Sequence, residues 1–362
     1  MNNEALNKIY AKLQSVPDHI LMGRYNTHYF VDFATTLDQL IETASLSSNK
    51  LLEHMYLTKL WMQKPFSINK YLQGVSELLF WIYAVQKHYS FDVDKKLSSD
   101  NDTDVDIQIR HEGYTFNIEV KCPDQREESA NTLYLCPAYR FQLSKENLNR
   151  EIAGLQSLIN PALESNTSKY ESTKVMKIDD NKVIEYLRSA QRKFQYDSSL
   201  NILVISVSSE MMQSIWGYLY NPQSGIFTRK LSEQFRNKDG SPMMHSDFDK
   251  VDVVLLTNIV SGHKVDVSFN AWNLENYCNI FFRNPYSKAG DSKSEQLKHF
   301  LKLLPNEVNR FEDERIKAIK RDRESKIDLL TDDLYLFEFL TRHYPLLCKT
   351  FTKSENAEES SK

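Results

Sequence analysis

Two short runs of alternating apolar and polar residues, joined by a glycine turn, constrain the fold of this chain most strongly. They occupy residues 104–121 and meet at Glu112-Gly113. Because successive side chains of a strand point to opposite faces, the alternation predicts a hairpin with one apolar face directed into a core. The other face would then carry Asp106, Glu119 and Lys121 together. Two carboxylates and an ammonium at one place on a sheet are what a hard divalent cation and an attacking water require.

The composition frames this hairpin as part of a large α/β protein. The chain has 362 residues, of which 41% are hydrophobic and 12% aromatic, so a sizeable core is expected. Only 9 glycines and 10 prolines argue against a turn-rich all-β fold. No apolar run is long enough to span a membrane, and the N-terminus is amphipathic rather than a signal peptide, so a cytoplasmic location is expected. The four cysteines lack zinc-ligand spacing, which predicts reduced thiols and no zinc site.

The net charge of −4 does not by itself indicate a nucleic-acid-binding protein. Basic residues nevertheless gather locally, at Arg188, Arg192 and Lys193 on one expected helix and within residues 229–238. Each cluster alone is most simply a solvated surface. A groove that follows phosphates requires several of them on one face.

Periodicity along the chain predicts four regions. Residues 1–64 are expected to be a helical N-terminal region, and residues 65–286 to hold an α/β domain. In that domain, an almost wholly apolar helix at about 68–88 precedes the hairpin. A helix beginning near 179 follows it, and then come strands at 201–207, 251–257 and 279–283. Residues 287–350 are expected to be helical and residues 351–362 to be a disordered acidic tail.

The order helix, antiparallel hairpin, helix and buried strand resembles the core of the PD-(D/E)XK nuclease superfamily, the restriction-endonuclease-like fold. That family pairs an acidic residue on one strand with a (D/E)-x-K triplet on the next, matched here by Asp106 and by Glu119-Val120-Lys121. Its upstream helix often contributes a glutamate, which corresponds to Glu77. Its downstream helix often contributes a glutamine or lysine, for which Gln191 is the first choice and Lys193 the second. No proline precedes Asp106, and Asp104 is a rival for its role because it has the same parity.

The triplet alone is a weak signal, since the chain contains five matches to it. Only the match at Glu119 lies in an alternating strand, with an aspartate in phase across a hairpin and a buried acidic residue on the preceding helix. The other four begin at Asp94, Asp180, Asp291 and Glu324. The sequence therefore places the candidate site at the hairpin.

The resemblance implies a mixed central sheet flanked by helices, with helical extensions at both ends. It also implies a metal-dependent nuclease that hydrolyses phosphodiester bonds, DNA being favoured over RNA. Asp106, Glu119, Glu77 and the carbonyl of Val120 would hold Mg²⁺, with Mn²⁺ able to substitute and Ca²⁺ inhibitory. Lys121 would orient water or stabilise negative charge. Such a nuclease suits a restriction or phage-defence effector, or equally a repair or mobile-element nuclease.

Three classes of protein stay open at this stage. A catalytically inactive nuclease-fold protein would use the same fold only for binding. A globular interaction protein would contain the hairpin incidentally, with Glu119 and Lys121 as a surface ion pair, Glu77 paired to another lysine and Gln191 on a helix surface. His111, beside the turn, is expected to be exposed. The chain carries no P-loop motif, so a motor or sensor would be a separate partner, and a homo-oligomer is a further possibility.

Overall fold

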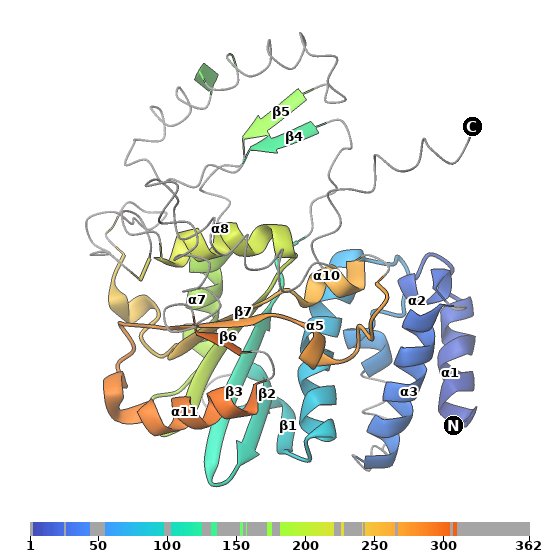
Figure 1. Ribbon diagram of the computed structural model, residues 1–362, viewed down its shortest axis with the longest axis horizontal. Helices are drawn as coiled ribbons and strands as arrows, with labels where there is room; N and C mark the ends of the chain where they lie inside the picture. Colours follow the sequence, from blue (N-terminus) through green and yellow to red (C-terminus); the bar gives the residue numbers. More distant parts are fainter. Residues whose placement is uncertain are drawn as a thin grey trace, which may run out of the picture.

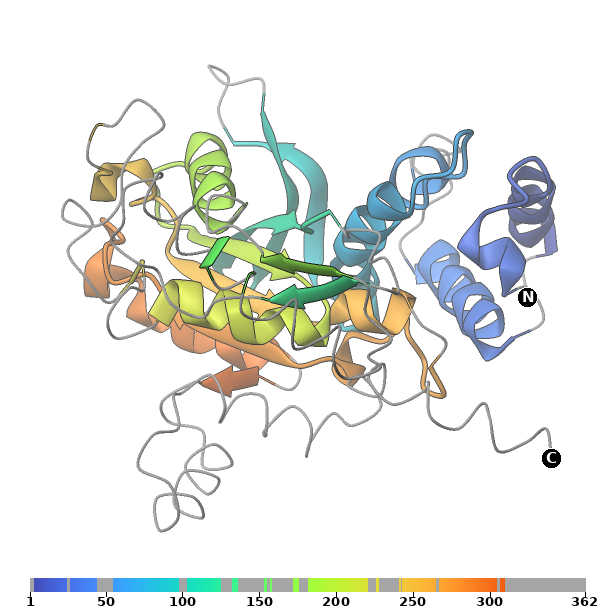
Figure 2. The same cartoon turned by 90° about the horizontal axis from the view of Figure 1, so that it is seen from above.

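The fold is built on one seven-stranded mixed sheet with helices on both faces (Figures 1 and 2). The computed structural model describes residues 3–24, 27–43, 55–97, 103–124, 132–135, 153–154, 157, 172–175, 182–220, 226–227, 241, 243–264, 267–304 and 307–309. The strand order is β1-β2-β3-β6-β7-β8-β9. The general α/β class expected from the sequence is confirmed.

The strands of the sheet follow the hydrophobic patterns of the sequence. The predicted hairpin is β2 and β3, and the continuous apolar runs form β6 and β7, which pair in parallel with each other and with β3. β1 and β8 add antiparallel strands, and β9 pairs in parallel with β8. The strands are β1 Ser90–Lys96, β2 Asp104–His111, β3 Tyr114–Lys121, β6 Leu200–Ser206, β7 Val253–Thr257, β8 Asn279–Arg283 and β9 Glu307–Asn309. A separate two-stranded sheet joins β4 Thr132–Leu135 to β5 Ser172–Val175.

Two hydrophobic cores lie on opposite faces of the sheet. The first packs α5 Ile68–Gln86, α10 Ile259–Lys264 and α11 Ser294–Leu303 against the sheet, and the second packs α7 Lys182–Lys193 and α8 Ser209–Tyr220. In β6, Ile202 and Val204 enter the first core, whereas Leu203 and Ile205 enter the second. Burial on both faces explains why this strand is continuously apolar in the sequence.

The N-terminal helices extend the first core beyond α5. They are α1 Asn3–Gln14, α2 Ile20–Gly23 and α3 His28–Thr43, and both views show them on the far side of α5 from the sheet (Figures 1 and 2). Leu13, Tyr29 and Phe33 share a core cluster with α5 residues. A π-helical turn, Met55–Lys59, runs directly against α5 at Gly74, where an added Cβ would collide with the backbone of Lys59. Because Gly74 has no side chain, the Lys59 backbone can pack against α5, and the Lys59 side chain can contact Asp94 of β1.

The C-terminal part of the described chain also belongs to the central sheet. Helix α11 contributes Phe300 and Leu303 to the first core, and β9 forms the last strand, so the sheet continues past the expected boundary at residue 286. The expectation that residues 287–350 are helical is wrong at β9. The expected charged helix and acidic tail beyond residue 309 lie outside the described residues.

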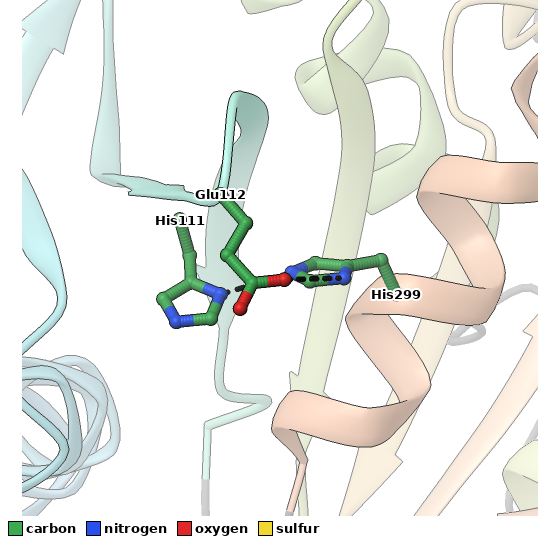
Figure 3. Close-up of side chains that lie close together, drawn as sticks. All are labelled: His111, Glu112 and His299. Atoms are coloured by element: carbon green, nitrogen blue, oxygen red, sulfur yellow. Dashed lines mark hydrogen bonds and ion pairs between the residues drawn. The ribbon is translucent and has the colours of Figure 1, made fainter.

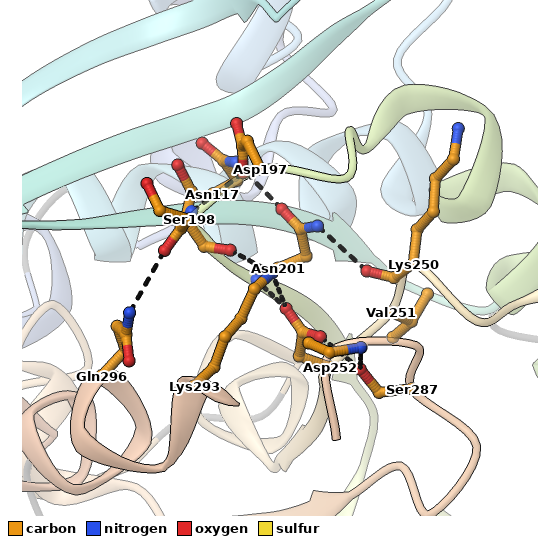
Figure 4. A network of polar contacts seen from close by, with 12 residues as sticks. Asn117, Asp197, Ser198, Asn201, Lys250, Val251, Asp252, Ser287, Lys293 and Gln296 are labelled. Carbon is orange, nitrogen blue, oxygen red and sulfur yellow. Dashed lines mark hydrogen bonds and ion pairs between the residues drawn. The ribbon is translucent and has the colours of Figure 1, made fainter. Parts of the chain in front are cut away.

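A buried polar network ties α11 to the start of β6 and β7 (Figure 4). Asp252 is its centre, because one carboxylate oxygen accepts hydrogen bonds from Lys293 Nζ at 2.8 Å and from the Asn201 amide at 2.9 Å. Its other oxygen accepts a hydrogen bond from the Ser287 hydroxyl at 2.5 Å. Lys293 also donates to the Ser199 carbonyl at 2.5 Å. With all of these groups partnered, the network is structural.

Candidate active site

Strands β2 and β3 bring Asp106 and Glu119 directly opposite each other. The antiparallel register pairs Ile107 with Ile118, which puts the next residues along, Asp106 and Glu119, on one face of the sheet. Asp106 Oδ2 accepts a hydrogen bond from the Val120 amide at 2.6 Å, so its side chain is fixed to the neighbouring strand. The hairpin predicted from the alternation therefore carries its two acids side by side.

Two lysines cover the carboxylate of Glu119. Its side chain is fully buried; Lys121 Nζ lies 2.5 Å from Oε1, and Lys193 Nζ lies 2.7 and 2.8 Å from the two oxygens. Lys121 comes from β3 itself, whereas Lys193 ends α7 on the second core's side of the sheet. The end of α7 thus covers Glu119 on the polar face of the hairpin, so the carboxylate and the two ammoniums have little contact with water.

Glu77 approaches the same site from α5, on the other side of the sheet. Lys59 Nζ contacts Glu77 Oε2 at 2.5 Å and Asp94 of β1 at 3.3 Å. The amide nitrogen of Gln73 contacts both Glu77 Oε1 at 2.5 Å and the Val120 carbonyl at 3.0 Å. The Gln73 side-chain amide therefore bridges Glu77 and the backbone of the triplet. The ion pair with Lys59 offsets the free-energy cost of burying the Glu77 carboxylate.

Burial and mutual repulsion shift the pKa values of the two strand acids. Burial and then the charge of Glu77 raise the pKa of Asp106 from 3.8 to about 7, although Lys193, the Val120 amide and Lys121 oppose the change. Burial and then Asp106 raise the pKa of Glu119, again against the two nearby lysines. Carboxylates that resist ionisation in this way favour binding of a cation.

The nearby lysines are held in their charged form. Burial alone would lower the pKa of Lys59, but Glu77 and Asp94 outweigh it and the pKa is raised. For Lys193, burial is likewise outweighed by Glu119 and Asp106, so its pKa is raised too. These ammoniums serve as fixed positive charges rather than as bases.

The structure places Gln191 away from these carboxylates. Its amide nitrogen donates to the Ser246 carbonyl at 2.9 Å and to Asp249 at 2.7 Å, and its oxygen accepts from the Lys250 amide at 2.8 Å. Gln191 thereby anchors α7 to the segment before β7. The second choice on this helix, Lys193, is the residue that reaches Glu119. Asp104, the rival for Asp106, lies opposite Lys96 near the start of β2.

A groove of about 750 Å³ opens beside Lys121 along α7. Among the described residues, its lining has three basic side chains, Lys121, Arg188 and Arg192, and two acidic ones, Glu185 and Asp247. Arg188 is partly engaged, since it lies 3.1 Å from Asp247. Lys121 lines the groove and also contacts Glu119. The other described residues of the lining are Tyr186, Ser189, Gln191 and Ser246.

The donor set fits a hard divalent cation. Asp106, Glu119 and the Val120 carbonyl present three oxygen donors at adjacent positions of β2 and β3, with Glu77 beyond Gln73. Magnesium prefers oxygen ligands and usually takes only one or two carboxylates from a protein. Burial first, and the nearby charge of Glu77 second, raise the pKa of Asp106, and a cation held by these oxygens would offset both effects.

Comparison with known proteins leaves this geometry to be interpreted on its own. No protein family, curated protein or solved structure matches the chain. Among the described residues, no helix combines the length and apolar character needed to cross a membrane.

Three residues of the site were not identified from the sequence: Lys59, Gln73 and Asp94. Lys59 lies 18 residues before Glu77 and 35 residues before Asp94 in the sequence, and only the fold brings these side chains together. Gln73 lies one helical turn before Glu77, on the same face of α5, so its position was available to helical periodicity. Gly74, a glycine inside a buried helix, was the available signal that another backbone packs there.

Proposed function

We propose that this chain is a metal-dependent nuclease that hydrolyses phosphodiester bonds, with DNA the favoured substrate. The observation that carries the proposal is the pairing of Asp106 and Glu119 across β2 and β3, with Lys121 and Lys193 in contact with Glu119. Acidic oxygens and ammoniums in one buried place suit a reaction in which an anionic diester gains further negative charge. The resemblance of the triplet to the PD-(D/E)XK superfamily, and hence the restriction-endonuclease-like fold, supports the same reading.

The residues would divide the chemistry between them. Asp106, Glu119 and the Val120 carbonyl would hold Mg²⁺, with Glu77 at the outer side. The bound ion would supply Lewis-acid stabilisation and an activated water. Lys121 lies between the groove and Glu119, so its ammonium would contact the scissile phosphate and stabilise the charge that develops on it. Lys193 would keep Glu119 oriented, and Arg188 and Arg192 would bind flanking phosphates.

A protein that binds nucleic acid without cutting it is the second candidate. One observation favours it: Glu119 is fully buried and both of its oxygens already contact lysine. If these ion pairs are permanent, the site is closed to a metal and the groove serves binding alone. An antiviral role, as for a restriction or phage-defence effector, is a further prediction under the nuclease reading.

Cleavage of supercoiled plasmid and single-stranded DNA and RNA tests the two candidates directly. We expect cutting with Mg²⁺ or Mn²⁺, none with EDTA, and loss of at least a hundred-fold in rate for Asp106→Asn, Glu119→Gln and Lys121→Met. Asp291→Asn is the matched control, because it alters another (D/E)-x-K triplet whose acid is exposed and pairs with Arg283. DNA binding without metal-dependent cleavage would favour the second candidate, and cleavage that survives all three changes would refute the site.

A further inference from the structure

A second cluster of ligating side chains lies at the opposite end of the β2–β3 hairpin (Figure 3). His111 ends β2, Glu112 occupies the turn and His299 projects from α11. His111 Nδ1 and His299 Nε2 lie 2.9 Å apart, and His299 Nδ1 lies 3.7 Å from Glu112 Oε2. One donor atom from each residue falls within 4.8 Å of the others. Three side chains from segments 188 residues apart in sequence thus point at one spot.

The turn and the surrounding rings hold the cluster in place. Glu112 and Gly113 have φ values of 48° and 81°, as a two-residue hairpin turn requires. The His111 ring packs on Tyr89 with centroids 4.8 Å apart, and the His299 ring packs on Tyr114 at 4.6 Å. His111 is therefore half-buried, and the expectation that it is exposed is wrong. Ring packing orients both imidazoles before any ligand arrives.

We propose that His111, His299 and Glu112 bind a borderline divalent transition-metal ion such as Zn²⁺. Two imidazole nitrogens and a carboxylate form a donor set suited to zinc, whereas Mg²⁺ prefers oxygen alone. Tetrahedral zinc with bonds of 2.0–2.1 Å separates its ligand nitrogens by about 3.3 Å, so the 2.9 Å contact needs to open only slightly. The Glu112 side chain is 68% exposed, so it has room to rotate toward the two imidazoles.

This site is separate from the candidate active site and does not depend on it. Glu119 lies five residues along β3 from Tyr114, the residue paired with His111, which corresponds to roughly 17 Å of strand. The expected absence of zinc rested on cysteine spacing, and this cluster contains no cysteine. An ion here would clamp the hairpin to α11, because its ligands come from both. It would stabilise the docking of α11 on the sheet by binding only the folded chain.

Calorimetric titration of the untagged chain with Zn²⁺, in excess Mg²⁺ to occupy all-oxygen sites, tests the proposal. We expect one saturable Zn²⁺ site, weakened at least ten-fold by Glu112→Gln and by His299→Phe. The phenylalanine keeps a ring against Tyr114, and melting without metal verifies that each variant is folded. His245→Ala is the matched control, since that exposed histidine lies outside the cluster and should leave Zn²⁺ affinity unchanged.

The visible absorption of Co²⁺ gives a second readout, because its bands become much more intense when the hydrated ion exchanges water for a tetrahedral set of protein ligands. We expect these bands with the wild-type chain and their loss in His299→Phe. A simple hydrogen bond between two neutral imidazoles would give the same 2.9 Å separation but no saturable binding. Absence of a saturable site, unchanged affinity in either cluster variant, or an equal loss in His245→Ala would overturn the proposal.

Discussion

Asp106 should make the folded chain less stable as the pH rises, and Asp106→Asn should remove that loss. The pKa of this carboxyl is 3.8 when unperturbed and about 7 in the fold, because burial and Glu77 oppose its ionisation. A carboxyl with a raised folded pKa contributes most to stability below its unfolded pKa, and this contribution is lost as the pH rises through the folded pKa. Asparagine carries no charge and keeps an oxygen to accept the Val120 amide.

The size of the effect follows from the shift. Each pKa unit corresponds to about 1.4 kcal/mol, so a shift of about three units sets an upper limit of about 4 kcal/mol. Asp106 is only half-buried by surface area, and the water that reaches it reduces the cost of its charge. We therefore expect Asp106→Asn to raise the free energy of unfolding by roughly 2–4 kcal/mol near pH 8 and by almost nothing near pH 4.

Urea unfolding of both proteins across this pH range measures the difference, in which the titration of groups distant from Asp106 cancels. Asp291→Asn is the control, because its side chain is 92% exposed and should show no such pH-dependent gain. A gain of equal size at both ends of the range, or no gain near pH 8, would refute the reasoning. Added Mg²⁺ should stabilise the wild-type chain more than the variant; equal stabilisation would place the ion elsewhere.

Three further substitutions test other parts of the structure. Gly74→Ala drives a methyl group into the backbone of Lys59, so unfolding measurements should show a loss of about 3 kcal/mol, whereas Gly23→Ala, with open space around it, should be tolerated. Lys293→Met leaves its buried aspartate partner uncompensated and should cost about 3–5 kcal/mol in urea unfolding, with cleavage per folded molecule unchanged. Lys193→Met removes an ammonium from the buried strand glutamate and should reduce cleavage at least ten-fold with an unchanged circular dichroism spectrum.

Strands and helices with an apolar face or a continuous apolar run were predicted from the sequence, whereas the two outermost strands of the sheet, β1 and β9, were not. The hairpin was predicted because burial of one face imposes a period on its side chains. The strands β6 to β8 and the helix α5 were predicted from their nearly continuous apolar runs, which result from burial on all sides. β1 was missed, since its residues are half-exposed and four of its seven residues are charged. β9 has only three residues, too few for any period to show.

The candidate site divides in the same way. Asp106 and Glu119 could be predicted from the sequence because they lie on the same hairpin. Glu77 could be predicted because an acidic side chain on a buried helix needs a partner. The role of Lys59 could not be predicted from the sequence, because its contact with Glu77 depends on how a separate turn packs on α5. The choice between Gln191 and Lys193 depends on the rotation of α7 against the sheet, which a single sequence does not specify.

The charges around Glu119 connect the stability of the fold to the proposed chemistry. Within the described part of the chain, four carboxylates meet three ammoniums here: Glu77, Asp94, Asp106 and Glu119 against Lys59, Lys121 and Lys193. With Asp106 protonated, these charges balance, and loss of its proton leaves one excess negative charge. A divalent cation would reverse the sign and leave the net positive charge that a phosphodiester anion requires. Under the proposed function, a proton and a cation would compete for Asp106. A bound cation would relieve the burial and the carboxylate repulsion that oppose ionisation of Asp106 and lower stability as the pH rises toward about 7.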